Sequence, residues 1–350
     1  MAMVGAHVLL WWAIGRARGV PLEGTLQHFD AGWYSLIVGE GYTRDPRCWV
    51  FYPLYPLAVR ALVAASGLWP WQATVGAVFS TVCLAVACRI AEGARTADPA
   101  GEHAGILYPR TSWGHAVLLL SPASFALHSH HTEGLFLALS LGAFALAGRD
   151  RPRLAAMLAG LSALTRTQGV IAAVCVGLWA ARRKRGGPAL AALAVSAAIS
   201  GTMYAAWPLY QWRMTGNPSI AVEMPRHWGL VVPWDVVVSS VLLRGADQHA
   251  DVPTLARYAA FLLALGTSAG IARRNWMVGL YLVLSLLANP LRGAPTYSAF
   301  RYLCVLFPVL FTWGDAIAQR GWTVRVAAGG LLVAANLQLA ANYGFGIEAY

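Results

Sequence analysis

The chain has 350 residues, of which 58% are hydrophobic and only 12% are charged, and its formal net charge is +11. Soluble domains carry about 25% charged residues, so this composition excludes an ordinary soluble globular domain. The basic residues lie between apolar runs instead of forming one patch, so the positive charge does not indicate a nucleic-acid partner.

Apolar runs that approach the length needed to cross a bilayer recur along the whole chain. They predict an all-α, polytopic transmembrane protein of about eleven spans, which we treat as one domain of residues 1–350. The first run contains Arg16 and Arg18 but no small-residue cleavage site, so we expect a retained span and not a signal peptide. The expected spans are 2–20, 71–91, 113–128, 133–148, 152–166, 168–181, 188–211, 255–272, 276–290, 301–318 and 324–342.

Alternate connections between these spans are basic, and the positive-inside rule places them in the cytoplasm. Residues 57–67 are too few to cross and predict a helix lying at the membrane interface. The short spans 152–166 and 168–181 predict a hairpin buried among other helices. The basic connections are 89–110, 149–153, 182–185, 273–274 and 320–325, which leaves outer loops at about 21–70, 212–254 and 291–300.

The first outer loop contains an acid among aromatic residues, in residues 30–34 (Asp-Ala-Gly-Trp-Tyr) and 51–56 (Phe-Tyr-Pro-Leu-Tyr-Pro). Asp30 at a membrane surface is a candidate general base. The alternative is that Asp30 caps a short helix. The aromatic side chains either anchor the loop at the interface or line a groove for a lipid and a sugar; they are Trp33, Tyr34, Phe51, Tyr52 and Tyr55.

A histidine-rich turn precedes the fourth apolar run, with His128, His130 and His131 followed by Glu133. Their spacing could supply metal ligands, but no second cluster completes a site, and we expect neither a metal nor a cofactor. Glu133 would begin the next helix, where the helix dipole favours an acid. It is therefore either a helix-terminal acid or part of the active cavity.

Three arginines on the outer side are candidate ligands for an anionic phosphate, because guanidinium groups bind phosphate through charge-assisted hydrogen bonds. Arg166 ends a short span, Arg301 opens a late span, and Arg292 lies in the loop before it. For Arg301 the alternative is a snorkelling membrane anchor. His227 and Trp228, in the large outer loop, either contact an acceptor or pack within the loop.

Taken in order, these motifs resemble the PIG-V family of mannosyltransferases, which belongs to the GT-C class of membrane glycosyltransferases. The resemblance covers about residues 27–310 and implies Asp30 as the base and Glu133 as an acid of the active cavity. It rests on residues 30–34, 41–42 (Gly-Tyr), 51–57, 121–124 (Ser-Pro-Ala-Ser), 132–136 (Thr-Glu-Gly-Leu-Phe), 164–169 (Leu-Thr-Arg-Thr-Gln-Gly) and 299–302 (Ala-Phe-Arg-Tyr).

Nucleotide sugars are cytoplasmic, so a transferase facing outward needs a sugar donor carried on a polyprenyl phosphate. The expected activity is inverting transfer of a hexose, with mannose implied by the resemblance, to a lipoglycan, cell-wall glycan or protein. The expected location is the lipid bilayer of a bacterial plasma membrane, with an extracytoplasmic active site. The alternatives are a transporter or flippase for a lipid-linked sugar, and a GT-C enzyme that uses another sugar such as arabinose.

Overall fold

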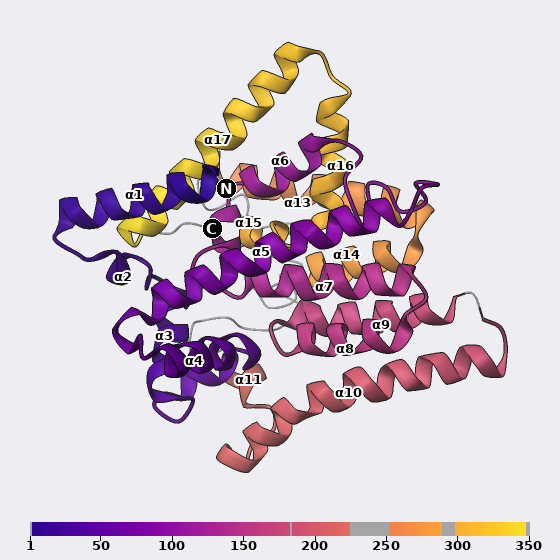
Figure 1. The fold of residues 1–350 in the computed structure, drawn as a ribbon, viewed down its shortest axis with the longest axis horizontal. Helices are drawn as coiled ribbons and strands as arrows, with labels where there is room; N and C mark the ends of the chain where they lie inside the picture. The colour runs from indigo at the N-terminus through magenta and orange to yellow at the C-terminus, as the bar shows by residue number, and fades with distance from the viewer. Residues whose placement is uncertain (1, 183, 225–251, 289–297, 348–350) are drawn as a thin grey trace.

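The computed structural model describes residues 2–182, 184–224, 252–288 and 298–347, and within these ranges the secondary structure is helical, without a named strand (Figure 1). The predicted all-α class is therefore confirmed. The α-helices are α1 (Ala2–Arg18), α2 (Leu22–Thr25), α3 (Asp30–Glu40), α4 (Leu54–Ser66), α5 (Gln72–Thr96), α6 (Ser112–Leu120), α7 (Glu133–Gly148), α8 (Pro152–Ala163), α9 (Thr167–Ala181), α10 (Gly187–Thr215), α11 (Ile220–Glu223), α13 (Val252–Arg274), α14 (Trp276–Leu287), α15 (Ala299–Leu303), α16 (Phe307–Ala318) and α17 (Trp322–Phe345).

Three helical stretches of the described residues are long and apolar enough to cross a membrane: Trp69–Thr96, Gly187–Thr215 and Trp322–Phe345. They contain α5, α10 and α17. The apolar helices α7, α9, α14 and α16 have only 10–17 residues, and at about 1.5 Å per residue they are shorter than the ~30 Å hydrocarbon layer. Possible membrane helices are thus present, while eleven complete crossings remain a prediction.

Two predicted spans are interrupted. Span 113–128 divides into α6 and a 3₁₀ turn (Ser124–Leu127), with Pro122 between them. Span 301–318 divides into α15 and α16, and Pro308 lies in the first turn of α16. Proline lacks the N–H that a helix interior requires, but its fixed φ suits a helix start. Both breaks therefore follow from proline positions that the apolar pattern alone does not reveal.

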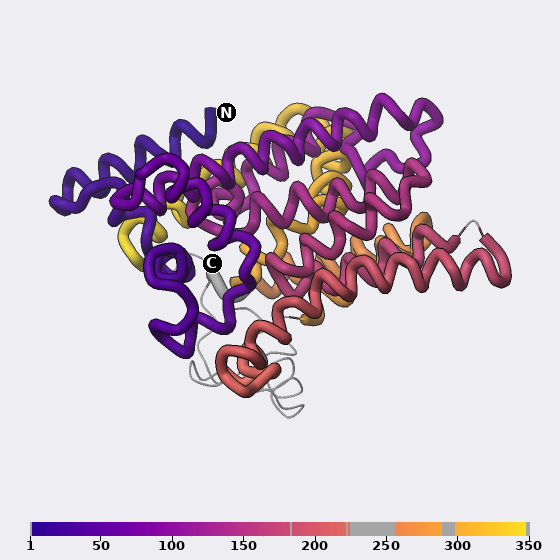
Figure 2. Tube along the Cα trace, turned by 60° about the horizontal axis from the view of Figure 1, so that its bottom comes forward, coloured from indigo at the N-terminus to yellow at the C-terminus, as the bar shows by residue number. Residues whose placement is uncertain are grey.

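The outer surfaces of the long helices are apolar. On α5 the exposed side chains Val78, Val82 and Val86 recur every four residues and form one stripe along the helix. α10 exposes Leu190 and Leu209, and Figure 2 shows α10 running along one edge of the molecule. Extended apolar surfaces of this kind are rare on soluble monomers, and they suit contact with lipid.

Helices α8 and α9 form the predicted hairpin and pack against each other, α7 and α10. The hairpin is not enclosed as expected, however. Leu154 and Met157 of α8 and Val174 of α9 are exposed, because the neighbouring helices of the described residues cover only part of its surface. The outer face of the hairpin is therefore as apolar as the exposed faces of the long helices.

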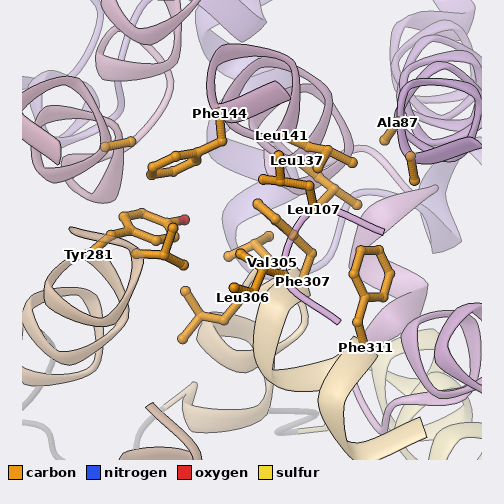
Figure 3. Packing of buried hydrophobic residues seen from close by; sticks show 14 of the residues in the cluster. Ala87, Leu107, Leu137, Leu141, Phe144, Tyr281, Val305, Leu306, Phe307 and Phe311 are labelled. Atoms are coloured by element: carbon orange, nitrogen blue, oxygen red, sulfur yellow. The ribbon is translucent and has the colours of Figure 1, made fainter. Parts of the chain in front are cut away.

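The main core surrounds α7. Figure 3 shows Leu137, Leu141 and Phe144 of α7 facing Tyr281 of α14 and Phe307 of α16, and all of these side chains are buried. α7 is apolar on all sides, which is typical of a helix inside a bundle. This packing fixes the axis of α7 and with it the position of its first residue, Glu133.

Three of the five predicted basic connections meet at one end of the bundle. Arg149 donates a hydrogen bond to the carbonyl of Gly93, and Arg274 Nη2 donates to the carbonyl of Ala104 at 2.8 Å. Helices α3 and α4 of the first outer loop lie near the opposite end of α5 (Figure 1). The connections 89–110, 149–153 and 273–274 are thus gathered on one side, away from the loop that carries Asp30.

The segment predicted as the first outer loop, residues 21–70, is mostly helical. The predicted interfacial helix 57–67 is present as α4, which starts at Leu54 and ends before Gly67, where φ is +73°. Its buried face contains Val59 and Val63, whereas Leu57 on its other side is exposed. α4 therefore packs one apolar face against the protein and exposes further apolar side chains, Leu57 and Leu62, that are available to lipid.

Candidate functional site

Asp30 is the first residue of α3 and follows Phe29, whose φ of +54° is unusual for a bulky residue. Such backbone conformations cost about 1–3 kcal/mol and cluster at functional sites. The position that would cap α3 belongs to Phe29, and no side-chain capping bond is made there. The capping interpretation of Asp30 is therefore wrong, and its carboxylate points to another partner.

That partner is Arg301 of α15. Arg301 pairs through Nη1 with Asp30 and through Nε with Glu133. Arg166, between α8 and α9, pairs through Nη1 with the same Glu133 oxygen. Acid and base alternate along this row, which we name the ion-pair network: Asp30, Arg301, Glu133 and Arg166. Its two positive and two negative charges balance.

Arg301 is only 5% exposed and is held by two carboxylates, so it is not positioned as a snorkelling surface anchor. A buried ion costs several kcal/mol unless it is paired and hydrogen-bonded. Glu133, with no exposed surface, meets this condition by binding two guanidinium groups. It lies behind the arginines and does not itself line the adjacent pocket, so Glu133 acts on the site through Arg301 and Arg166.

A pocket of about 100 Å³ opens beside the network. Asp30, Arg166 and Arg301 all line it, so the structure brings together three residues that the sequence motifs nominate separately. The full lining is Asp30, Tyr34, Val50, Phe51, Tyr52, Thr132, Thr165, Arg166, Thr167, Gln168, Ala288, Arg301 and Tyr302.

Three of the five predicted aromatic residues line this pocket: Tyr34, Phe51 and Tyr52. The hydroxyl of Tyr52 lies 3.2 Å from Thr167 Oγ1, which connects the first outer loop to the start of α9. Trp33 stacks on Phe51, with ring centroids 6.1 Å apart. It lies beside the pocket and supports one of its walls.

Tyr55 does not reach the pocket. It is fully buried, and its hydroxyl lies 2.9 Å from His130 Nδ1 and accepts a hydrogen bond from Ser80 Oγ at 3.3 Å. The interpretation that placed Tyr55 at the cavity is wrong, because Tyr55 lies on the buried face of α4 together with Val59 and Val63. Its contacts give Tyr55 a structural role under α4.

The histidine-rich turn does not form a metal site. His128 Nε2 lies 2.9 Å from His7 Nδ1, His130 contacts Tyr55, and His131 Nδ1 lies 2.8 Å from Ser129 Oγ. The three rings therefore bond to different partners and do not converge. Among the residues that the structure describes, no group of three or more His, Cys, Asp or Glu side chains could hold a metal ion.

Sequence reasoning overlooked the hydrogen bonds that join α1 and α17 to this turn and to the segment before it. His7 of α1 donates through Nε2 to Asn336 Oδ1 of α17 at 2.5 Å, and Asn336 Nδ2 donates to the carbonyl of Ser121 at 2.7 Å. Polar residues inside apolar helices were the available signal, since such residues are costly unless they are bonded across helices.

Sequence reasoning also overlooked Gln168 and Tyr302 as pocket residues, although both stand inside the quoted motifs. Gln168 Oε1 accepts a hydrogen bond from Arg166 Nε at 3.2 Å. The guanidinium of Arg166 lies 5.1 Å from the ring centroid of Tyr302, a cation–π arrangement. Both contacts position Arg166. Arg292, His227 and Trp228 lie outside the described residues.

Comparisons with protein-family models, curated proteins and solved structures give no match for this chain. The resemblance to PIG-V mannosyltransferases therefore rests on the sequence motifs, and the functional argument rests on the geometry of the pocket.

Proposed function

We propose that this protein is a membrane glycosyltransferase of the GT-C type, which transfers a hexose such as mannose from a polyprenyl phosphate to an extracytoplasmic acceptor with inversion. The observation that carries the proposal is that one carboxylate, Asp30, and two guanidinium groups, Arg166 and Arg301, line the same pocket. A base and an anion-binding group side by side are what this reaction requires.

In the proposed reaction Asp30 takes the proton of the acceptor hydroxyl while the acceptor oxygen bonds to the anomeric carbon. The bond between that carbon and the phosphate oxygen breaks, and its electron pair leaves with the polyprenyl phosphate. The arginines stabilise the negative charge that develops there.

A single displacement inverts the anomeric carbon, whereas retention through a covalent intermediate needs a second carboxylate as nucleophile. The nearest second acid in the described residues is Glu133, which is fully buried and bonded to both arginines. It is not accessible to a sugar. The accessible chemistry of the pocket therefore favours inversion.

The surroundings of the pocket suit a lipid-borne donor. An apolar groove of about 440 Å³ lies between α9 and α10 and is lined by residues such as Val170, Val174, Leu178, Leu193 and Tyr204. Helix α9 contributes to both sites, with Gln168 in the pocket and Val170 in the groove. A charged pocket and an apolar groove that share a helix suit an anionic head carried on an isoprenoid chain.

The proposal includes the predicted topology of about eleven spans, with the basic connections in the cytoplasm.

The experiment that tests the function incubates the purified protein in vesicles with a sugar-labelled polyprenyl-phosphate mannose and a membrane extract as acceptor. Transfer of label with release of polyprenyl phosphate supports the proposal. A flippase would move the lipid without cleaving the sugar–phosphate bond, and that outcome would replace the proposal by the transport alternative.

A further inference from the structure

Helix α9 starts at the pocket. Its first two residues, Thr167 and Gln168, line the pocket directly, and Arg166 precedes them. The first turn of an α-helix has N–H groups without partners inside the helix, and the helix dipole adds partial positive charge there. α9 has fifteen residues, long enough for this dipole to be developed.

The side chain of Gln168 supplies a second, independent observation. It is 1% exposed, and its Oε1 accepts the hydrogen bond from Arg166 Nε. A guanidinium only donates hydrogen bonds, so this contact fixes which end of the amide faces Arg166. The other end, Nε2, has no hydrogen-bond partner within the described residues.

A buried amide nitrogen without a partner is unfavourable in the ligand-free protein. Because Gln168 lines the pocket, an acceptor group placed there would satisfy it. The pocket of about 100 Å³ has room for a group the size of a phosphate and is well below the roughly 300–1,000 Å³ of sites for drug-sized ligands.

From these observations we infer that the first turn of α9, Gln168 Nε2 and Arg166 form a binding subsite for a phosphate ester. This inference rests on the proposed function for the source of the phosphate, the lipid donor, and adds Gln168 as a ligand-binding residue. The phosphate accepts hydrogen bonds from the Gln168 side-chain amide, the Arg166 guanidinium and the backbone N–H of Gln168; the N–H of Gly169 is not used, since it donates to the carbonyl of Arg166.

The inference also gives the two arginines, Arg166 and Arg301, different roles. Arg301 is engaged by two carboxylates, Asp30 and Glu133. Arg166 shares Glu133 but stands at the start of α9 beside Gln168. Before transfer the phosphate therefore lies on the Arg166 side of the pocket while Arg301 holds the base, and Arg301 contributes its charge only once Asp30 is protonated.

The test measures binding of farnesyl phosphate to the full-length protein in detergent, with farnesol and inorganic phosphate as comparison ligands. Gln168→Met removes the donor without adding charge, and Gln168→Glu keeps the size and the acceptor for Arg166. Both variants should bind farnesyl phosphate at least about tenfold more weakly, the effect of one hydrogen bond to a charged group. Farnesol binding should not change.

Gln72→Met is the matched control. Gln72 likewise stands in the first turn of a helix, α5, and has one buried amide atom, Oε1, without a partner in the described residues, but it does not line the pocket. This variant should bind farnesyl phosphate as the wild type does. The thermal stability of each ligand-free variant is measured in parallel, and Gln168→Glu keeps the test valid if Gln168→Met does not fold.

Wild-type affinity for farnesyl phosphate in both Gln168 variants would overturn the subsite and leave the proposed function intact. Equal affinity for inorganic phosphate and farnesyl phosphate, both lost in the variants, would support the subsite and contradict the lipid donor. Failure of the wild type to bind any phosphate would overturn the subsite, and the separate transfer assay would then decide the function.

Discussion

Asp30 and Arg301 form an ion pair in which the acid is accessible and the arginine is not. The side chain of Asp30 is 36% exposed and that of Arg301 only 6%, because Arg301 is also held by Glu133 from behind. In the proposed reaction, the proton that Asp30 accepts removes the negative member of this pair. The charge of Arg301 is then available in the pocket at the moment when the leaving phosphate gains negative charge.

Replacing Glu133 should destabilise the protein strongly. Glu133→Gln leaves two buried guanidinium groups without their shared carboxylate, and breaking a buried pair costs about 3–5 kcal/mol. We expect a clear fall in the thermal unfolding temperature in detergent. Glu92→Gln is the control, since its pair with Arg95 is exposed and contributes about 0–1 kcal/mol. Similar unfolding temperatures for the two variants would contradict the claim that Glu133 stabilises the two buried arginines.

Arg301→Lys should lower transfer although it keeps the charge. Arg301 uses two different nitrogens for two carboxylates, and a single ammonium group cannot reproduce that geometry. We expect a lower kcat, with Arg301→Ala lower still, in steady-state kinetics against varied donor. Arg47→Lys, at an exposed pair with Asp45, serves as the control. Wild-type kinetics for Arg301→Lys would remove Arg301 from the reaction and leave it only a structural role in the ion-pair network.

Chelation of divalent ions should leave transfer largely intact. The arginines supply the positive charge at the pocket, and the imidazoles of His128, His130 and His131 bond to separate partners. The measurement is turnover before and after dialysis against EDTA. Loss of activity that a divalent ion restores would show that the reaction uses a metal and would reopen the role of this turn.

Impermeant thiol reagents applied to intact cells should label the first outer loop and not the connection 182–185. Cys48 is unsuitable as the outer probe because it is fully buried. Arg44→Cys replaces it, since the Arg44 side chain is 66% exposed, and Lys184→Cys is the inner probe at an exposed position. Both are made in a background without the native cysteines. If the reagent labels Lys184→Cys and not Arg44→Cys, the protein has the opposite orientation in the membrane.

The sequence motifs nominated residues that line one pocket, but they did not predict how these residues interact. Asp30 and Arg301 are 271 residues apart, and their separate motifs were enough to nominate both. Charge pairing depends on tertiary packing, which local patterns do not contain, so the shared role of Glu133 was not predicted. Gln168 was overlooked for the same reason: its unpartnered amide is visible only once Arg166 and the pocket are placed.

For the fold, too, the sequence predicted the helices better than the way they break and pack. Apolar periodicity predicted the helices, including α4, but not the breaks at Pro122 and before Pro308. Hydropathy also does not distinguish an apolar helix that contacts lipid from one buried among its neighbours, such as α7. The inward orientation of Tyr55 and the contact between His7 and His128 likewise follow from packing across the chain.

The most direct test of the central claim is the rate of label transfer from polyprenyl-phosphate mannose by Asp30→Asn and Asp45→Asn. Asp45 is a suitable control because hydrogen bonds from the Arg47 side chain and backbone lower the pKa of its carboxyl, so it is a charged acid of the same loop outside the pocket. With general-base contributions of about 100-fold or more, Asp30→Asn should lose at least that factor in transfer while Asp45→Asn stays near wild type. Near-normal transfer by Asp30→Asn in folded protein would contradict the account.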